Sequence, residues 1–222
     1  MKTILPLLII VLTVLGAAGC RQDNVSPIRN VRFDPKLLNQ MKVAGNCTNY
    51  SYRSGQDQRN LGTIHTGQVQ VTFRDDVTTT QRDEVLARYG FVTGILSQSA
   101  TQSGMMYTLG LTGGLNCAQA EQAIRELARD KAIAYAGPAF LVETGQAVGL
   151  SNEIMIKADA SGAETLKQLA ADFNAIVKGP VGADTYMVQL SKQSKGNALE
   201  FVNALSNDKG IAHAAPGFVL AP

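Results

Sequence analysis

One short segment occurs twice in this chain in similar form, and it constrains the fold more than any other feature. The segment "DKAIAYAGPAFL" covers residues 130–141, and "DKGIAHAAPGFVL" covers residues 208–220. The two prolines, Pro138 and Pro216, are 78 residues apart. Similarity at a fixed spacing within one chain indicates a duplicated structural unit. We therefore expect two related units.

The periodicity that precedes each ending predicts the same order of elements in both units. Residues 68–73 and 153–158 alternate apolar and polar side chains, the two-residue period of a half-buried strand. A helical pattern, two further strands and a second helix follow in each copy. The second helices share an apolar stripe at i, i+3, i+4 and i+7. Its members are Ala120, Ala123, Ile124 and Leu127 in the first copy, and Ala198, Phe201, Val202 and Leu205 in the second.

The order strand, helix, strand, strand, helix, strand is that of a ferredoxin-like unit. We predict an α+β fold of two tandem ferredoxin-like (βαββαβ) domains with antiparallel sheets. The first domain is expected over residues 67–146 and the second over residues 150–222. Pro138 and Pro216 are expected to end strand pairing, because proline cannot donate to a ladder.

Two local signals predict how the first helix of each copy begins and ends. The stretch "SGAE", residues 161–164, is typical of a capping box that starts the helix of the second copy. Gly90 and Asn174 follow the last apolar residues of these helices, where a left-handed turn is favoured.

The first residues are typical of an export signal. Residues 1–19, "MKTILPLLIIVLTVLGAAG", place one lysine before an apolar run. The stretch "LGAAGC" resembles the lipobox of bacterial lipoproteins, which implies a lipid anchor at Cys20; the alternative is an ordinary cleaved signal peptide. Residues 20–66 are predicted to be a lipidated tether with a short helix begun by Asp34 and Pro35. We expect a membrane-anchored protein of the bacterial cell envelope, periplasmic or surface-exposed.

The remaining cysteines, Cys47 and Cys117, form either a disulfide, which an exported compartment permits, or two buried thiols. Neither has a companion cysteine at a two-residue spacing, so we expect no metal site. The formal net charge of +2 comes without a basic block, which argues against nucleic-acid binding.

No set of residues predicts catalysis. The two histidines, His65 and His213, are far apart in the sequence. His213 occupies the position of Tyr135 in the other copy and is expected to be a half-buried sheet residue, because a general base needs positioned partners. We therefore predict neither an enzyme nor a cofactor.

The quoted repeats also resemble the prodomains of subtilisin-like proteases, a peptidase-inhibitor family, over most of residues 68–222. The segments that show the resemblance are "ARYG" at residues 87–90, "YTLGL" from Tyr107, "YMVQL" from Tyr186 and the two repeated segments at residues 130–141 and 208–220. Gly137 and Ala215 stand where that family has an acidic residue before the proline.

This resemblance implies that the sheet packs on a protease while the tail beyond the last strand lies in its active-site cleft, as in strand addition. The second copy supplies that tail in this chain. Its residues are Pro216, Gly217, Phe218, Val219, Leu220, Ala221 and Pro222.

Three classes of function follow. The first is a lipoprotein that inhibits or chaperones a subtilisin-like protease. The second is a structural or adhesive surface lipoprotein that uses the duplicated fold as a protein-binding scaffold. The third is a small-molecule sensor that uses the groove between the two units. An exposed apolar sheet face would favour partner binding, and polar open faces on both copies would favour the scaffold.

Overall fold

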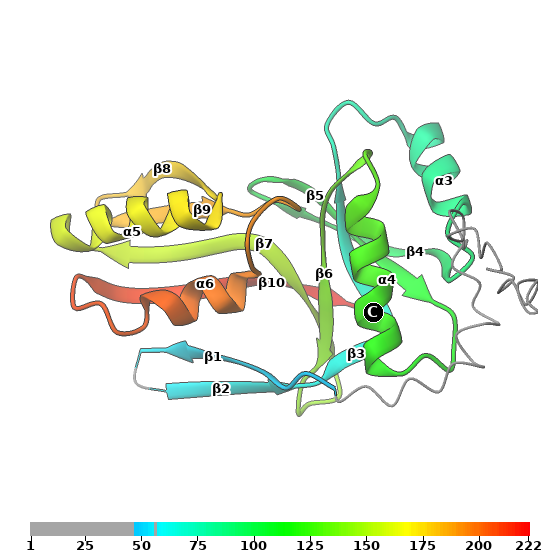
Figure 1. Cartoon of the computed structure of the whole chain (residues 1–222), viewed down its shortest axis with the longest axis horizontal. Coiled ribbons are helices and arrows are strands. Elements are labelled where there is room, and N and C mark those ends of the chain that lie inside the picture. Colours follow the sequence, from blue (N-terminus) through cyan, green and yellow to red (C-terminus); the bar gives the residue numbers. More distant parts are fainter. Residues whose placement is uncertain (1–46, 56) are drawn as a thin grey trace, which may run out of the picture. The chain divides into compact units, whose positions relative to one another are not determined.

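The computed structural model describes residues 47–55 and 57–222, and its fold is α+β with antiparallel strand pairs (Figure 1). The predicted signal peptide, the lipidation site at Cys20 and the helix expected at Asp34 lie outside the described residues.

Two sets of elements follow one another along the chain, each in the order strand, helix, strand, strand, helix, strand. We call residues 64–141 the first half and residues 147–221 the second half. The first half consists of β3 (Ile64–Phe73), α3 (Thr79–Ala87), β4 (Val92–Thr101), β5 (Gly104–Leu111), α4 (Cys117–Arg129) and β6 (Ile133–Leu141). The second half consists of β7 (Ala147–Ala158), α5 (Ala160–Phe173), β8 (Ile176–Gly182), β9 (Thr185–Gln189), α6 (Ala198–Leu205) and β10 (Ile211–Ala221).

All strands of both halves belong to one eight-stranded sheet. The order is β6-β3-β5-β4 in the first half and β10-β7-β9-β8 in the second, so the first strand of each half lies between its third and fourth. Pairing of β6 with β7 joins the halves. The two halves therefore share one sheet.

Strand β7 is the junction, and both of its edges are paired. Strand β10 runs along one edge from Ala147 to Ala158. The other edge is divided, because β6 pairs with residues 147–149 and β9 pairs with residues 153–157. The 12-residue length of β7 is what allows it to serve both halves.

The apolar stripes predicted on the second helices are buried in the core. Of their members, Ala120, Ala123 and Leu127 on α4, and Ala198, Phe201 and Val202 on α6, are 0% exposed. Each helix begins at an asparagine, Asn116 or Asn197, whose side-chain oxygen accepts a hydrogen bond from a free amide of the first turn. Figure 1 shows α4 beside β6 and α6 beside β10.

The turn before the last strand has the same geometry in both halves. The Oδ1 atom of Asp130 accepts a hydrogen bond from the amide of Ala132, and that of Asp208 accepts one from the amide of Gly210, both at 2.8 Å. This turn leads into β6 in the first half and into β10 in the second.

Helix α5 corrects one cap prediction and confirms another. The helix begins at Asp159, whose carboxylate accepts hydrogen bonds from the amides of Ser161 and Gly162, so the predicted capping box at residues 161–164 is wrong. An aspartate just upstream satisfies the same free amides. Asn174 ends the helix in the left-handed conformation, with φ 53°, as predicted. Gly90 is not among the residues with positive φ, because α3 ends at Arg88 in a right-handed turn.

The prediction that proline ends the last strands is wrong. Pro138 pairs with Val69 inside β6, and Pro216 pairs with Ile154 inside β10. Proline is tolerated at an unpaired edge. Pairing of β6 with β7 begins only at Ala139, and β10 pairs with β7 alone, so each proline has an edge free of backbone partners.

The segment predicted to be a tether contains a hairpin. Strands β1 (Tyr50–Ser54) and β2 (Asp57–Gly62) pair antiparallel in a separate two-stranded sheet, and β3 already begins at Ile64. We call residues 50–62 the strap.

Candidate partner-binding surface

The sheet face of the first half that faces away from its helices is covered. It carries polar side chains of β3 and β5, yet Gln70 is 0% and Thr108 1% exposed. The Thr108 hydroxyl donates to Gln70 Oε1 at 3.1 Å. Strand β3 was predicted to be half-buried, but residues 68–73 are buried on both faces.

The cover is the second half, because β7 crosses this face after leaving β6. A side chain on Gly149 would collide with Gln70. The Tyr135 hydroxyl lies 3.3 Å from the carbonyl oxygens of Leu150 and Ser151, and burial raises the pKa of this tyrosine. We call this contact region the seam.

The structure explains why glycine stands at position 137, where the prodomain family has an acidic residue. A side chain at this position would occupy the space of the Tyr135 phenol ring. The acidic residue expected there would displace the ring that reaches β7 across the seam.

The corresponding face of the second half is more open. Met155 lies opposite Met187 on β9 and Ala215 on β10, on the side away from α5 and α6. Met187 is 5% exposed and Met155 and Ala215 are half-buried, whereas the next row contains the exposed Lys157 and His213. We call this area the methionine face; besides these residues it includes Glu153, Thr185, Gln189 and Ile176, of which Ile176 is 54% exposed.

His213 corrects a prediction about the sheet. It was expected to be half-buried like its counterpart Tyr135, but it is exposed whereas Tyr135 is 5% exposed. A register shift between Ile211 and His213 alters the alternation of β10 at this point. The other histidine, His65, lies in β3, where its Nδ1 atom accepts a hydrogen bond from the Gly67 amide.

The predicted tail, residues 216–222, is paired. Phe218, Val219, Leu220 and Ala221 lie opposite β7 residues, and only Pro222 follows the strand. The Pro222 carbonyl accepts a hydrogen bond from Gln68 Nε2 at 2.6 Å. Residues 216–221 therefore belong to β10 and do not form the free tail that the resemblance implies.

The strap contacts both halves. The ring of Tyr50 packs on Phe140 of β6 with centroids 5.3 Å apart, and its hydroxyl donates to Glu121 of α4 at 3.2 Å. The pKa of Tyr50 is raised to about 12, chiefly by burial. On the other side, the Arg53 amide donates to Asn203 Oδ1 of α6 at 2.9 Å.

The chain just before the strap is covalently attached to the first half. Cys47 and Cys117, the first residue of α4, are joined by a disulfide with their Cα atoms 5.6 Å apart. Of the two arrangements left open by the sequence, the structure contains the bonded one.

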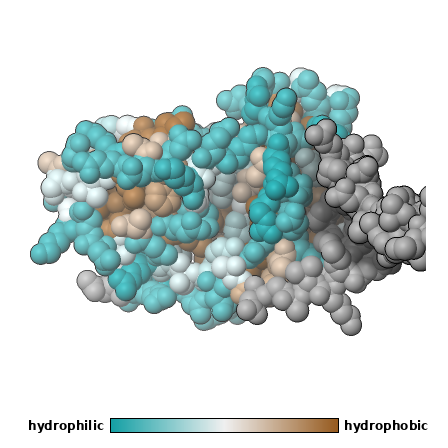
Figure 2. All heavy atoms as spheres, in the orientation of Figure 1, coloured by the Kyte–Doolittle hydropathy of each residue, from teal (hydrophilic) through white to brown (hydrophobic). Residues whose placement is uncertain are grey.

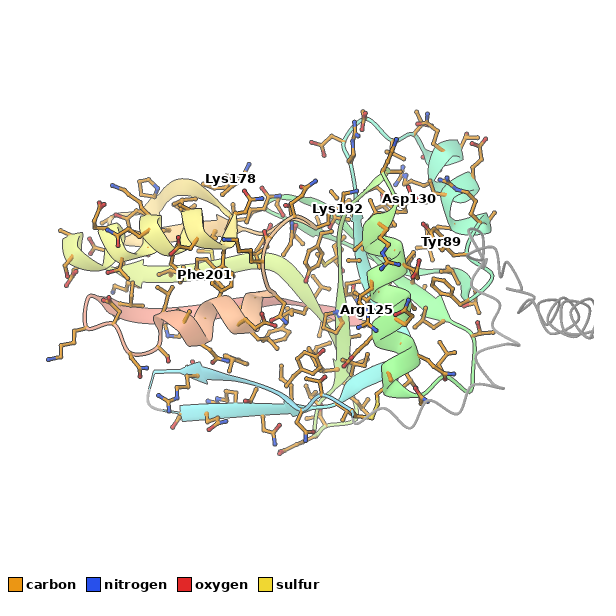
Figure 3. The ribbon with its side chains drawn as sticks, viewed as in Figure 1. Tyr89, Arg125, Asp130, Lys178, Lys192 and Phe201 are labelled. Atoms are coloured by element: carbon orange, nitrogen blue, oxygen red, sulfur yellow. A yellow bond between two sulfur atoms is a disulfide. The ribbon has the colours of Figure 1, made fainter. Side chains whose placement is uncertain are left out.

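A cavity of about 590 Å³ lies between the strap, α4, β6 and the segment before α6. Its charged lining residues are Glu121, Arg125, Lys195 and Glu200, two of each sign. Glu121 is engaged by Tyr50 and lies 3.8 Å from Arg125. Arg125 extends from α4 in Figure 3. The balanced charge of the lining selects no class of ligand.

Asp130 is a structural carboxylate. Its Oδ2 atom lies 3.2 Å from an Arg88 nitrogen and accepts a hydrogen bond from the Tyr89 hydroxyl at 3.0 Å. The Lys192 ammonium group donates to the Asp130 backbone carbonyl (Figure 3). Burial and this carboxylate raise the pKa of Tyr89 to about 12. The cluster joins the end of α3, the end of α4 and the segment after β9.

Residues 47–55 and 57–222 contain neither a metal-binding cluster nor a membrane-spanning helix. Among these residues, no group of three or more His, Cys, Asp or Glu side chains could hold a metal ion. No helix within residues 47–55 and 57–222 has the length and apolar character needed to span a membrane.

Comparisons with known proteins show no family. No family model matches the chain, and no curated protein matches it. Among solved structures, the chain is similar to the small subunit of acetolactate synthase from Thermotoga maritima, with 17% identity and a TM-score of 0.29. That match covers 71% of this chain and 97% of the other.

Proposed function

We propose that this chain is a membrane-anchored lipoprotein of the bacterial cell envelope that binds a subtilisin-like protease through the methionine face. The lipid anchor rests on "LGAAGC" and Cys20, and the class of partner rests on the prodomain resemblance. The observation that carries the proposal is the unequal exposure of the two sheet faces. The first is closed by the seam, and the second is reachable from solvent.

The proposal includes two tandem ferredoxin-like units derived by duplication. Their matching strand orders, buried helix stripes and turns at Asp130 and Asp208 support it. The duplicated units then differ in role. The first half supports the second, and the second half contacts the partner.

The chemistry of the methionine face suits a protein partner. Methionine side chains are flexible and polarisable, so they adapt to the surface that packs against them. The half-buried Met155 lies at the centre of this face beside Met187, which is 5% exposed, with Glu153, Lys157 and His213 around them. An apolar centre with a polar rim is the usual anatomy of a protein interface.

The pairing of the tail alters the proposed mode of action. Residues 218–221 are bonded into β10, so insertion of the tail into a protease cleft would require part of that strand to separate from β7. We therefore propose binding by the sheet face, with inhibition or chaperoning arising from coverage of the protease surface. A scaffold role is favoured for the first half, whose polar face is fully used within the chain.

The test uses the full chain with Cys20→Ser, titrated against a panel of subtilisin-like proteases while complex formation and protease activity are both measured. Met155→Lys places a charge at the centre of the methionine face and should weaken binding at least about tenfold, because an unpaired charge in an interface core must be desolvated. Met105→Lys is the matched control, since Met105 is a 39% exposed methionine on β5, outside that face.

Equal binding by the two variants would show that the methionine face is not the binding surface. If no protease in the panel binds the parent chain, the protease proposal is lost and the scaffold function is favoured.

A further inference from the structure

The two cysteines of the disulfide are unequally exposed. Cys47 is exposed and lies just before the strap, whereas Cys117 is 5% exposed at the start of α4. Thiol–disulfide exchange depends on which sulfur an attacking thiolate can reach. A reductant that approaches from solvent therefore meets Cys47 first.

The leaving group in this direction is the buried Cys117. It is the first residue of α4, directly after the N-cap Asn116. The dipole at a helix N-terminus favours a thiolate, whereas burial in apolar surroundings opposes one. Exposure is therefore the observation that selects Cys47 as the cysteine under attack.

The disulfide also determines how firmly the strap is held. Without it, the C-terminal end of the strap is still joined by the chain to β3, which begins at Ile64, and Leu61 packs against the core. The N-terminal end, β1, is then held by the ring and hydrogen-bond contacts of Tyr50, Ser51, Tyr52 and Arg53. The contacts to Asn203 and Asn207 are at exposed positions, where water competes with them. The disulfide adds a second covalent tether, so that both ends of the strap are kept beside the two halves.

We propose that Cys47–Cys117 is a thiol-exchange site for a dithiol reductant, and that its reduction releases the strap. The reductant thiolate attacks Cys47 Sγ, forming a mixed disulfide and breaking the bond to Cys117. Cys117 leaves as a thiolate and takes a proton from water. The second thiol of the reductant then attacks its own mixed-disulfide sulfur, so that Cys47 is released as a thiol and the reductant becomes a disulfide.

Release of the strap has a structural consequence. The strap covers Phe140 of β6 through Tyr50 and contacts Phe218 of β10 through Tyr52. It also forms one wall of the 590 Å³ cavity. Reduction therefore uncovers aromatic surface on both halves and widens the cavity, while β6–β7 pairing keeps the halves together.

The first experiment tests the direction of attack on the intact, oxidised full chain carrying Cys20→Ser. The probe is a Cys-x-x-Cys dithiol reductase whose second cysteine is replaced by serine, which traps the mixed disulfide. Peptide mass spectrometry should find at least about nine-tenths of the adduct on Cys47. Adduct mainly on Cys117, or no adduct after prolonged incubation, would overturn the proposal.

The second experiment tests release by hydrogen exchange before and after reduction of the same protein. Amides of residues 50–54 should exchange at least about tenfold faster after reduction, because the N-terminal end of the strap loses its covalent anchor. Amides of α6 and β9 serve as the internal control and should change much less. Unchanged protection of the strap would show that the disulfide does not retain it.

Discussion

Substitution of Gly149 by alanine tests the seam directly. The added Cβ would overlap the Gln70 side chain, which is 0% exposed and cannot turn into solvent. Overpacking of this kind costs about 1–3 kcal/mol. Displacement of Gln70 also breaks its buried hydrogen bond with Thr108, which contributes about 1 kcal/mol. We expect Gly149→Ala to lower the free energy of unfolding by about 2–4 kcal/mol.

The assay is urea unfolding, with Gly113→Ala as the matched control because nothing lies within 4 Å of a Cβ built there. The free energy of unfolding of the control should change by less than about 1 kcal/mol. Adding Gln70→Ala to Gly149→Ala removes the overlapping atoms, so the double variant should lose less stability than the sum of the single changes. A Gly149→Ala protein as stable as the control would refute the account in which β7 crosses the first half.

Three further predictions concern the disulfide, the core and one helix cap. Replacing both Cys47 and Cys117 by alanine opens a loop of sequence separation 70 and should cost about 4 kcal/mol by loop entropy, measured by urea unfolding; a loss under about 1 kcal/mol would contradict this. Phe201→Ala should cost about 3–5 kcal/mol, since the ring is 0% exposed and lies 5.1 Å from that of Phe173, whereas Leu220→Ala at a 69% exposed position should change the free energy of unfolding by less than about 0.5 kcal/mol. Hydrogen bonds from the Gly162 amide and from Ser161 lower the pKa of Asp159 below its ordinary value of 3.8. The stabilisation of the folded state by this carboxylate is therefore fully present above that pH and is lost as the pH falls through the folded-state pKa. Asp159→Ala should therefore be less stable than the parent near neutral pH and converge with it in acid, and a stability gap that stays constant down to about pH 2 in thermal unfolding would argue against the cap.

Local patterns predicted most of the individual elements. Helical spacing predicted the buried stripes that contain Ala120 on α4 and Ala198 on α6. Residue type predicted the left-handed turn at Asn174. These features depend on neighbours within a few residues, which sequence contains directly. The N-cap of α5 was misplaced because Asp159 and Ser161 are both good caps, and the choice depends on where the preceding strand ends.

The methionine face and the seam could not be distinguished from sequence. Strands β3 and β7 alternate apolar and polar side chains in the same way, so the pattern alone does not say which open face is covered. Gln70 and Thr108 are polar, yet both are buried, and β7 approaches Gln70 at Gly149. A signal was present in Gly149, because a glycine inside a strand often marks the close approach of another chain segment.

The sequence by itself determined the duplicated order of strands and helices and the apolar stripes of α4 and α6, because period and residue type encode which side of an element is buried. Only the tertiary structure decided that β6 and β9 share one edge of β7 and that the strap contacts both halves. It also decided that the open sheet face of the first half is covered, whereas that of the second half is more exposed. Those outcomes depend on contacts between residues far apart in the chain, and an amphipathic pattern does not specify which surface will cover it.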